Sequence, residues 1–140
     1  MKAVAFALLL LPVCGYGMER FAALSMIETG DNDRAVGRAG EISRYQVRKA
    51  EWHSVIKSAN YTDFETARRV TVRIMNRRLS SFRSHFGRQP TDFEFYGLWN
   101  APSQVMKGRI SHTVAARCRR FANLCASDPS PVQLVAANGS

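Results

Sequence analysis

The stretch that decides the fold covers residues 28–47 and has the sequence ETGDNDRAVGRAGEISRYQV. Leu24 and Ile27, just before it, are spaced for one side of a helix, and Glu28 follows Leu24 by about one helical turn. Gly30 favours the left-handed conformation in which many helices end. The sequence therefore predicts Glu28 in the last turn of a helix, at the edge of its core-facing side.

The position of Glu28 has a chemical consequence. Partial burial disfavours the charged form of a carboxyl group, and the partial negative charge at a helix C-terminus acts in the same direction. Both effects raise the pKa of the group, which is the property that a general acid needs near neutral pH. The alternative is a solvated glutamate in a last helical turn, and position alone does not choose between the two.

A family resemblance favours the general acid. In the soluble lytic transglycosylases and goose-type lysozymes, Glu-Ser/Thr-Gly is followed by Ala-Val, by a small residue with Gly, and by a Gln before an aliphatic residue. The chain departs from this signature at Ser43-Arg44-Tyr45, where the family usually has Gly-Leu-Met, and at Glu41, where a small residue is usual. Without any insertion, the stretch resembles the signature at Glu28, Thr29, Gly30, Ala35, Val36, Ala39, Gly40 and Gln46.

A second segment, residues 98–102, resembles the family's helix end Ala-Tyr-Asn-Ala-Gly, which lines the substrate cleft. Here it reads Leu-Trp-Asn-Ala-Pro, so Trp99 replaces the Tyr whose hydroxyl contacts the catalytic Glu, and Pro102 replaces the Gly. An indole N–H can donate a hydrogen bond but cannot accept one. Tyr96 lies about one turn earlier and is an alternative source of the hydroxyl. Trp99 is expected either in the cleft or in the core.

The resemblance implies a mainly α, lysozyme-like single domain with little or no β structure. It implies cleavage of the β-1,4 bond between N-acetylmuramic acid and N-acetylglucosamine in peptidoglycan, with Glu28 as general acid and then base and with help from the substrate's acetamido group. The product would be a 1,6-anhydro sugar in a transglycosylase and a hydrolysed sugar in a lysozyme. No metal or other cofactor is implied. The implied substrate-binding residues are Ser43, Tyr45, Gln46, Tyr96, Trp99 and Asn100.

Glycosidases that use two carboxylates need a second acid at a set distance from the first. Glu41 stands on the motif loop, although a solvated loop glutamate is the plainer interpretation. Asp31 and Asp33 are also near in sequence, and with Asn32 between them they resemble the start of a calcium loop. The further ligands and the closing Glu of such a loop are missing, so a polar turn is expected. A mechanism with one acid fits this chain better.

With 140 residues, the chain is long enough for one domain with a real core. Residues 1–17 have the positive start, short apolar run and small residues of a secretory signal peptide, and the run is too short for a comfortable membrane span. A lipid anchor at Cys14 is an alternative that the preceding Val fits poorly. We expect a catalytic domain over residues 18–126, a disordered tail over residues 127–140, and a periplasmic or extracellular location.

Two cysteines, Cys118 and Cys125, remain after removal of the signal peptide. Export permits a disulfide between them. On an unbroken helix, however, their Cα atoms would lie about 10 Å apart, which is beyond the reach of a disulfide. A bond requires a turn between them, and two buried thiols are the alternative. The three histidines, His53, His85 and His112, have no metal-ligand spacing with these cysteines.

Further helices are predicted after two capping boxes, Thr62–Glu65 and Thr91–Glu94, and after Ser111. The last helix is expected to place Val114, Cys118, Phe121 and Cys125 inward and Arg117, Arg119 and Arg120 outward. The first of the three is expected to carry apolar residues on one side and a basic face on the other. This face, which is either solvated or bound to a polyanion, consists of Arg68, Arg69, Arg73, Arg77, Arg78 and Arg83.

The net charge of +9, from 20 basic and 11 acidic side chains, favours anionic partners. For an exported protein, the expected partner is peptidoglycan, and we expect a monomer that does not bind nucleic acid. A cell-wall or secretion-apparatus protein remains open as a further partner. Two alternatives remain: an exported domain that binds glycan without cutting it, and a basic helical nucleic-acid binder, which would require that the chain is not exported.

Overall fold

The computed structural model describes residues 17–126, which form a mainly helical single domain. Residues 1–16 of the predicted signal peptide, the lipid anchor considered at Cys14 and the predicted tail over residues 127–140 lie outside the described residues. Within residues 17–126, no helix combines the length and the apolar character needed to cross a bilayer. The helices are α1 (Arg20–Thr29), α2 (Lys49–Val55), α3 (Phe64–Phe86), α4 (Asp92–Asn100), α5 (Pro102–Met106) and α6 (His112–Ala126).

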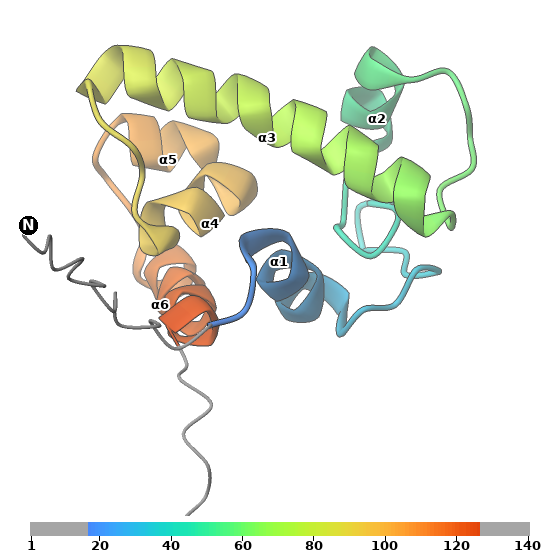
Figure 1. Ribbon diagram of the computed structural model, residues 1–140, viewed down its shortest axis with the longest axis horizontal. Coiled ribbons are helices and arrows are strands. Elements are labelled where there is room, and N and C mark those ends of the chain that lie inside the picture. Colours follow the sequence, from blue (N-terminus) through green and yellow to red (C-terminus); the bar gives the residue numbers. More distant parts are fainter. Residues whose placement is uncertain (1–16, 127–140) are drawn as a thin grey trace, which may run out of the picture.

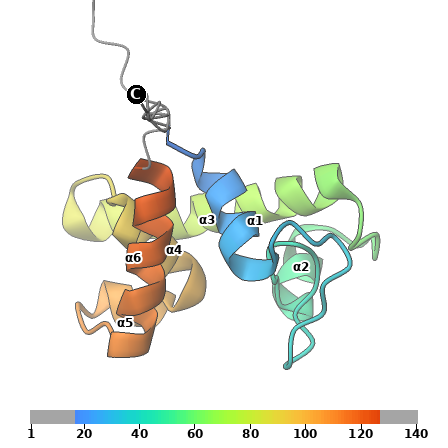
Figure 2. The same ribbon diagram turned by 90° about the horizontal axis from the view of Figure 1, so that it is seen from below.

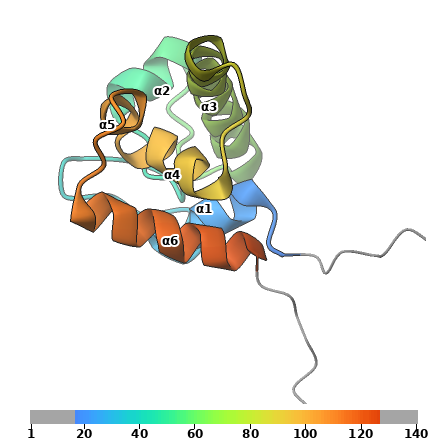
Figure 3. The same cartoon turned by 90° about the vertical axis from the view of Figure 1, so that its left-hand side faces the viewer.

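Helix α4 occupies the centre of the fold, between the long helix α3 and helix α6 (Figures 1 and 3). Phe95, Tyr96 and Leu98 of α4 are buried in the core. Gly97 allows close packing against α5, because a Cβ atom there would lie only 2.6 Å from Cγ2 of Val105. Helix α1 lies beside α6, and α2 packs against α3 (Figures 1 and 2). This arrangement brings the end of α1, the end of α4 and the middle of α3 towards one another.

The helix ends follow local sequence signals. The capping box at the start of α4 is confirmed, since Thr91 and Glu94 cap each other's backbone N–H groups. Gly30 ends α1 in the left-handed conformation, with φ 63°. The capping box predicted at Thr62 is wrong, because α3 begins one residue later and the side chain of Asp63 accepts its capping hydrogen bond from the N–H of Thr66. Ser111 caps α6 through a hydrogen bond from the N–H of Val114, at 3.3 Å.

The loop between α1 and α2 is held by two isolated antiparallel bridges, Val36 with Ile42 and Ile42 with Val47. Ile42 and Val47 exchange both backbone hydrogen bonds, each 2.9 Å long. Residues 17–126 contain no sheet beyond such bridges, which agrees with the prediction of a mainly α fold. The loop is therefore ordered by a few short-range pairings and by its buried side chains.

Two predictions about side-chain faces are decided by the helices. The cysteines lie on one unbroken helix, α6, and both are free thiols, Cys118 buried and Cys125 half-buried, so of the two alternatives left open the unpaired one holds. The assignment of Arg78 to the outer basic face of α3 is wrong. Its side chain is only 17% exposed and contacts α2 and α4. Arg78 lies four residues after Ile74 and four before Phe82, both buried, so helical spacing puts it on the apolar side, and its long side chain extends from there to α2 and α4.

Candidate active site

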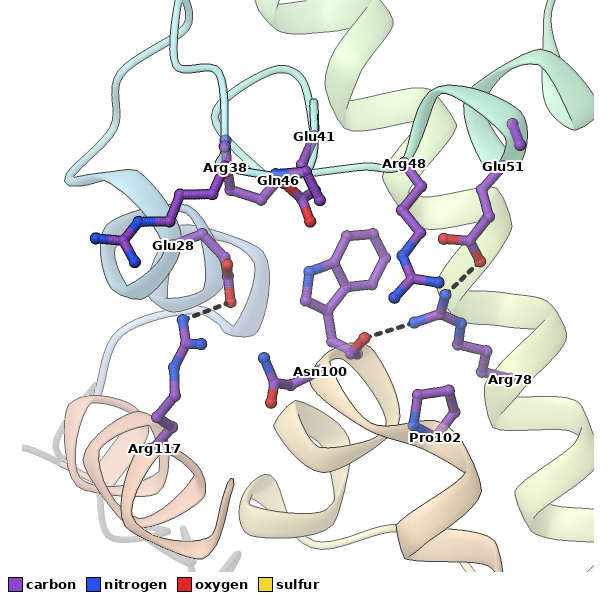
Figure 4. Close-up of a pocket in the computed structure, with 14 residues that line it drawn as sticks. Glu28, Arg38, Glu41, Gln46, Arg48, Glu51, Arg78, Asn100, Pro102 and Arg117 are labelled. Atoms are coloured by element: carbon purple, nitrogen blue, oxygen red, sulfur yellow. Dashed lines mark hydrogen bonds and ion pairs between the residues drawn. The ribbon is translucent and has the colours of Figure 1, made fainter. Parts of the chain in front are cut away.

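A cleft of about 660 Å³ opens where α1, α3, α4 and α6 meet the loop before α2 (Figure 4). This volume lies within the range of ordinary ligand sites. Its wall carries four arginines and three glutamates, so it is rich in charged groups. The lining residues are Glu28, Gly37, Arg38, Ala39, Glu41, Gln46, Arg48, Ala50, Glu51, Arg78, Trp99, Asn100, Pro102 and Arg117.

Glu28 lies in the last turn of α1 and faces this cleft, with a side chain only 8% exposed. Desolvation is the largest influence on its carboxyl group and raises its pKa above the ordinary value. The nearby charge of Glu41 acts in the same direction, whereas Tyr96 and Arg117 oppose it. The pKa of Glu28 is therefore raised by burial, while Tyr96 and Arg117 are placed to stabilise the carboxylate.

The hydroxyl group beside Glu28 comes from Tyr96 and not from the residue at position 99. It donates a hydrogen bond of 2.7 Å to Oε1 of Glu28. Tyr96 itself is fully buried in α4 and stacks on Phe121, with ring centroids 5.4 Å apart. Burial raises the pKa of the Tyr96 hydroxyl, so this group keeps its proton and remains a donor. Tyr96 contacts Glu28 and is not among the residues that line the cleft.

Arg117 was expected on the outer face of the last helix, and this expectation is wrong. Its Nη2 lies 3.5 Å from Oε1 of Glu28, and its guanidinium lies over the ring of Tyr96 at 5.7 Å from the centroid. Figure 4 shows Arg117 reaching from α6 towards the end of α1. Its side chain is 40% exposed, so water screens part of its charge. Arg117 thus joins the last described helix to the carboxyl group of the first.

Trp99 and Asn100, at the end of α4, both line the cleft. Trp99 is 8% exposed, so it belongs to both the core and the cleft wall. Its indole N–H donates to the carbonyl of Tyr45 at 3.1 Å and makes no hydrogen bond to Glu28. The guanidinium of Arg78 covers the ring at 5.1 Å from the centroid. Trp99 therefore fixes the motif loop against α4.

Gln46 lines the cleft, whereas Ser43 and Tyr45 do not. Ser43 and Tyr45 are both buried, at 2% exposure, so only their backbone is available for the sugar positioning expected of this segment. Ser43 has φ 66°, a conformation that favours glycine, and its carbonyl accepts a 3.2 Å hydrogen bond from the amide of Gln46. These residues shape the loop that presents Gln46.

Gly37 makes room for two polar groups of the same loop. A Cβ atom at Gly37 would lie 2.3 Å from a carboxylate oxygen of Glu41 and 2.4 Å from the amide oxygen of Gln46. Both side chains therefore converge on the bare backbone at this position. Glu41 also accepts a 3.1 Å hydrogen bond from the N–H of Ala39, so it is a member of the cleft wall held by the loop itself.

The acidic residues after α1, Asp31 and Asp33, pair with the side chain of an arginine from the same loop. Arg44 pairs with Asp33 through bonds of 2.6 and 3.0 Å and lies 3.5 Å from Asp31. Its guanidinium also lies over Phe64 at 4.6 Å from the centroid. No group of three or more metal-ligating side chains occurs among residues 17–126. The cluster is a turn tied to the motif loop, as expected.

The far wall of the cleft is built around Arg78. It donates 2.9 and 2.7 Å hydrogen bonds to the carbonyls of Leu98 and Trp99, and its other Nη pairs with Glu51 (Figure 4). These bonds satisfy carbonyl groups at the C-terminal end of α4, where cations are favoured. Sequence analysis connected neither Glu51 nor Arg48 with a site, since nothing in their spacing points to one. It placed Arg78 on the outer basic face, although the spacing of Arg78 with buried Ile74 and Phe82 is a signal that it turns inward.

The described residues thus form a polar cleft with one buried carboxyl group, a neutral donor and a cation beside it, and an amide on each of two neighbouring walls. This arrangement can donate a proton to a bound polar substrate and then stabilise the resulting carboxylate. Comparison of the chain with protein-family models, with curated proteins and with solved structures finds no match.

Proposed function

We propose that this protein is a peptidoglycan lytic transglycosylase in which Glu28 is the general acid and base. The observation that carries the proposal is the setting of Glu28: a carboxyl group in an open cleft, 8% exposed, with a raised pKa and a 2.7 Å hydrogen bond from Tyr96. General acids of glycosidases need such a raised pKa. Because peptidoglycan lies outside the cytoplasmic membrane, the proposal includes export of a monomeric enzyme.

In the proposed reaction, Glu28 gives its proton to the glycosidic oxygen as the bond to the muramyl C1 breaks. The carboxylate that forms is stabilised by Tyr96 and Arg117, which already favour that form. It then takes the proton from the C6 hydroxyl of the same muramyl unit as that oxygen bonds to C1, giving the 1,6-anhydro sugar. Water in place of this hydroxyl gives the hydrolysed product.

The other two glutamates of the cleft, Glu41 and Glu51, make different contacts from those of Glu28. Glu51 is paired with Arg78, and Glu41 accepts a backbone hydrogen bond from Ala39. Only Glu28 combines an 8% exposed side chain with a raised pKa and a short hydrogen bond from a neutral hydroxyl. This difference favours a mechanism with one acid, in which the substrate's acetamido group supplies the assistance that a second carboxylate gives elsewhere.

The loop geometry adds support to the family resemblance. Ser43 stands where the family usually has glycine, and its φ of 66° is a value at which glycine is favoured. Gln46 follows at the family's spacing and faces the cleft. The departure at Ser43 therefore changes the side chain and keeps the backbone conformation.

The test is mass spectrometry of purified peptidoglycan digested with the mature protein, with Glu28→Gln and with Glu65→Gln. Glu65 is exposed on α3, so Glu65→Gln makes the same chemical change away from the cleft. We expect anhydro-muropeptides from the wild type and from Glu65→Gln, and a rate about 10²- to 10⁴-fold lower for Glu28→Gln. Reducing-end products with the same dependence would identify a lysozyme.

If the wild type releases no muropeptides but binds the sacculus, the proposal of an enzyme is wrong and the glycan-binding alternative replaces it. Equal release by wild type and Glu28→Gln would remove Glu28 from the acid role. Circular dichroism and thermal unfolding of all three proteins show whether a lost activity reflects chemistry or a lost fold.

A further inference from the structure

The cleft holds an arginine whose charge has no partner within residues 17–126. Arg48 lines the cleft and is exposed, and no hydrogen bond or ion pair to another described residue satisfies its guanidinium. Figure 4 shows this guanidinium pointing into the cleft beside that of Arg78. The charge of Arg78 is balanced by Glu51. The positive charge of Arg48 therefore remains available at the end of the cleft away from Glu28.

The other charged groups of the cleft do not neutralise Arg48. Glu51 is engaged by Arg78, and Glu41 accepts its hydrogen bond from the loop backbone. Glu28 lies across the cleft and is contacted by Arg117. Even with every glutamate charged, the lining has four arginines against three glutamates, so a bound ligand meets a net positive wall.

A guanidinium that projects into a cleft is suited to a carboxylate, which it can bind through two parallel hydrogen bonds. A muramyl glycan offers carboxylates from two sources. One is the lactyl group on the sugar when no peptide is attached, and the other is the stem peptide, whose attachment converts the lactyl carboxyl into an amide. Chitin-like strands of N-acetylglucosamine alone have neither.

We propose that Arg48 binds a carboxylate carried by the glycan strand, at a sugar beyond the reacting bond, and so selects acidic muramyl strands over neutral ones. This inference rests on the proposed function, because it names the substrate group that the same cleft recognises. Arg48 acts in binding and lies away from Glu28, so its removal raises KM and leaves kcat largely unchanged.

The test compares wild type, Arg48→Gln and Arg73→Gln on three forms of the same glycan. Arg73 is exposed on α3 outside this cleft, so Arg73→Gln makes the same change in net charge elsewhere. The substrates are intact strands, strands stripped of peptide by an amidase, and intact strands whose carboxylates are capped as methylamides. The first offers peptide carboxylates, the second lactyl carboxylates, and the third none.

We expect Arg48→Gln to raise KM about tenfold on a carboxylate-bearing form, as loss of a charged hydrogen bond does, with no change on the capped strands. The form that is affected identifies the source of the carboxylate. An equal effect on all three forms, no effect on any, or the same effect from Arg73→Gln would overturn the inference.

Failure of the proposed function is distinguishable from failure of this inference. If the wild type cleaves none of the three forms, the same polymers are used in a sedimentation binding assay. Weaker binding of carboxylate-bearing strands by Arg48→Gln alone would then uphold the carboxylate site on a non-catalytic domain. Equal binding by all three proteins would reject it.

Discussion

The end of α1 and the start of α4 each carry a glutamate, and the pKa values of the two carboxyl groups are shifted in opposite directions. Glu28, in the last turn of α1, has a pKa raised by burial. Glu94, in the first turn of α4, has a pKa lowered to about 2 by hydrogen bonds from Arg88 and Thr91. The two are linked through α4, because Tyr96 lies two residues after Glu94 and donates to Glu28.

The difference follows from the number of donors and from the helix ends. Glu94 receives two bonds from Arg88, at 2.6 and 2.8 Å, and two from Thr91, at 2.9 and 3.1 Å, at a helix start that favours negative charge. Glu28 receives one short hydrogen bond, from a neutral hydroxyl, and it lies at a helix end that disfavours negative charge. The surroundings of a glutamate therefore decide whether it serves as a fixed anion or as a proton donor.

Removing the hydroxyl that links the two regions should have the largest effect on stability. Tyr96→Phe leaves the buried Glu28 with only the long contact to Arg117, and we expect the free energy of unfolding to fall by about 1–3 kcal/mol. The hydroxyl lowers the pKa of Glu28, so its loss raises that pKa further and moves the alkaline limb of the kcat/KM profile to higher pH. Tyr61→Phe is the control, because its hydroxyl bonds to exposed His53. A limb displaced to lower pH would contradict this.

Removing the charge of Glu94 at the start of α4 should have a smaller effect on the free energy of unfolding. Glu94→Gln keeps a side-chain acceptor for the cap and loses the charge, so we expect a loss of about 1 kcal/mol at neutral pH. Because the folded-state pKa of Glu94 is depressed, this contribution is present above its ordinary value of 4.5 and disappears as pH falls towards about 2. Denaturant unfolding at several pH values measures it. A difference that persists unchanged at pH 2 would show that the ion pair is not its source.

Glu28→Gln should show the opposite pH dependence in the same experiment. Native Glu28 binds its proton more tightly than the unfolded chain does, so wild-type stability falls as pH rises from about 4.5 through the folded pKa. Glutamine does not titrate, and the variant therefore gains stability relative to the wild type across that window. The effect should be modest, since Tyr96 and Arg117 partly offset the desolvation. If the free energy of unfolding of Glu28→Gln falls relative to the wild type as pH rises, Glu28 is a stabilised anion in the folded protein.

The smallest change in stability should come from Arg117→Met. The ion pair with Glu28 is 3.5 Å long and the arginine is 40% exposed, so we expect less than about 0.5 kcal/mol. The pKa of Glu28 should nevertheless rise, because Arg117 lowers it, and the alkaline limb of kcat/KM should move upward. Arg119→Met, on the exposed side of α6, is the matched control. Identical profiles for both variants would remove Arg117 from the site.

The parts of the fold that depend on near neighbours in sequence could be predicted. Gly30 ends α1 and Thr91 caps α4 because the groups involved lie within a few residues of each other. The capping residue of α3 was misassigned by one position, since Thr62 and Asp63 both carry acceptors and the box pattern favoured the first. Local rules thus locate helix ends to within about a residue when acceptors are adjacent.

The surroundings of Glu28 could be predicted only in part. Its place at the edge of an apolar side follows from helical spacing, and Tyr96 was one of two candidates for the hydroxyl. The position of Arg117 could not be foreseen, because a long side chain at the border of a helix face can turn either way and the packing of distant helices decides. Helical spacing puts Arg78 on the apolar side of α3, but it does not show which groups of α2 and α4 this arginine contacts. The glutamate partners of these two arginines lie 89 and 27 residues away in sequence.

The contact between α1 and α6 also fixes when the site comes into existence. Glu28 is made early and Arg117 follows 89 residues later, which at about 5–20 residues per second takes several seconds of synthesis. Until then Arg117, one of the two groups that lower the pKa of Glu28, is missing from the chain. The complete surroundings of the Glu28 carboxyl group therefore require both the first and the last described helix.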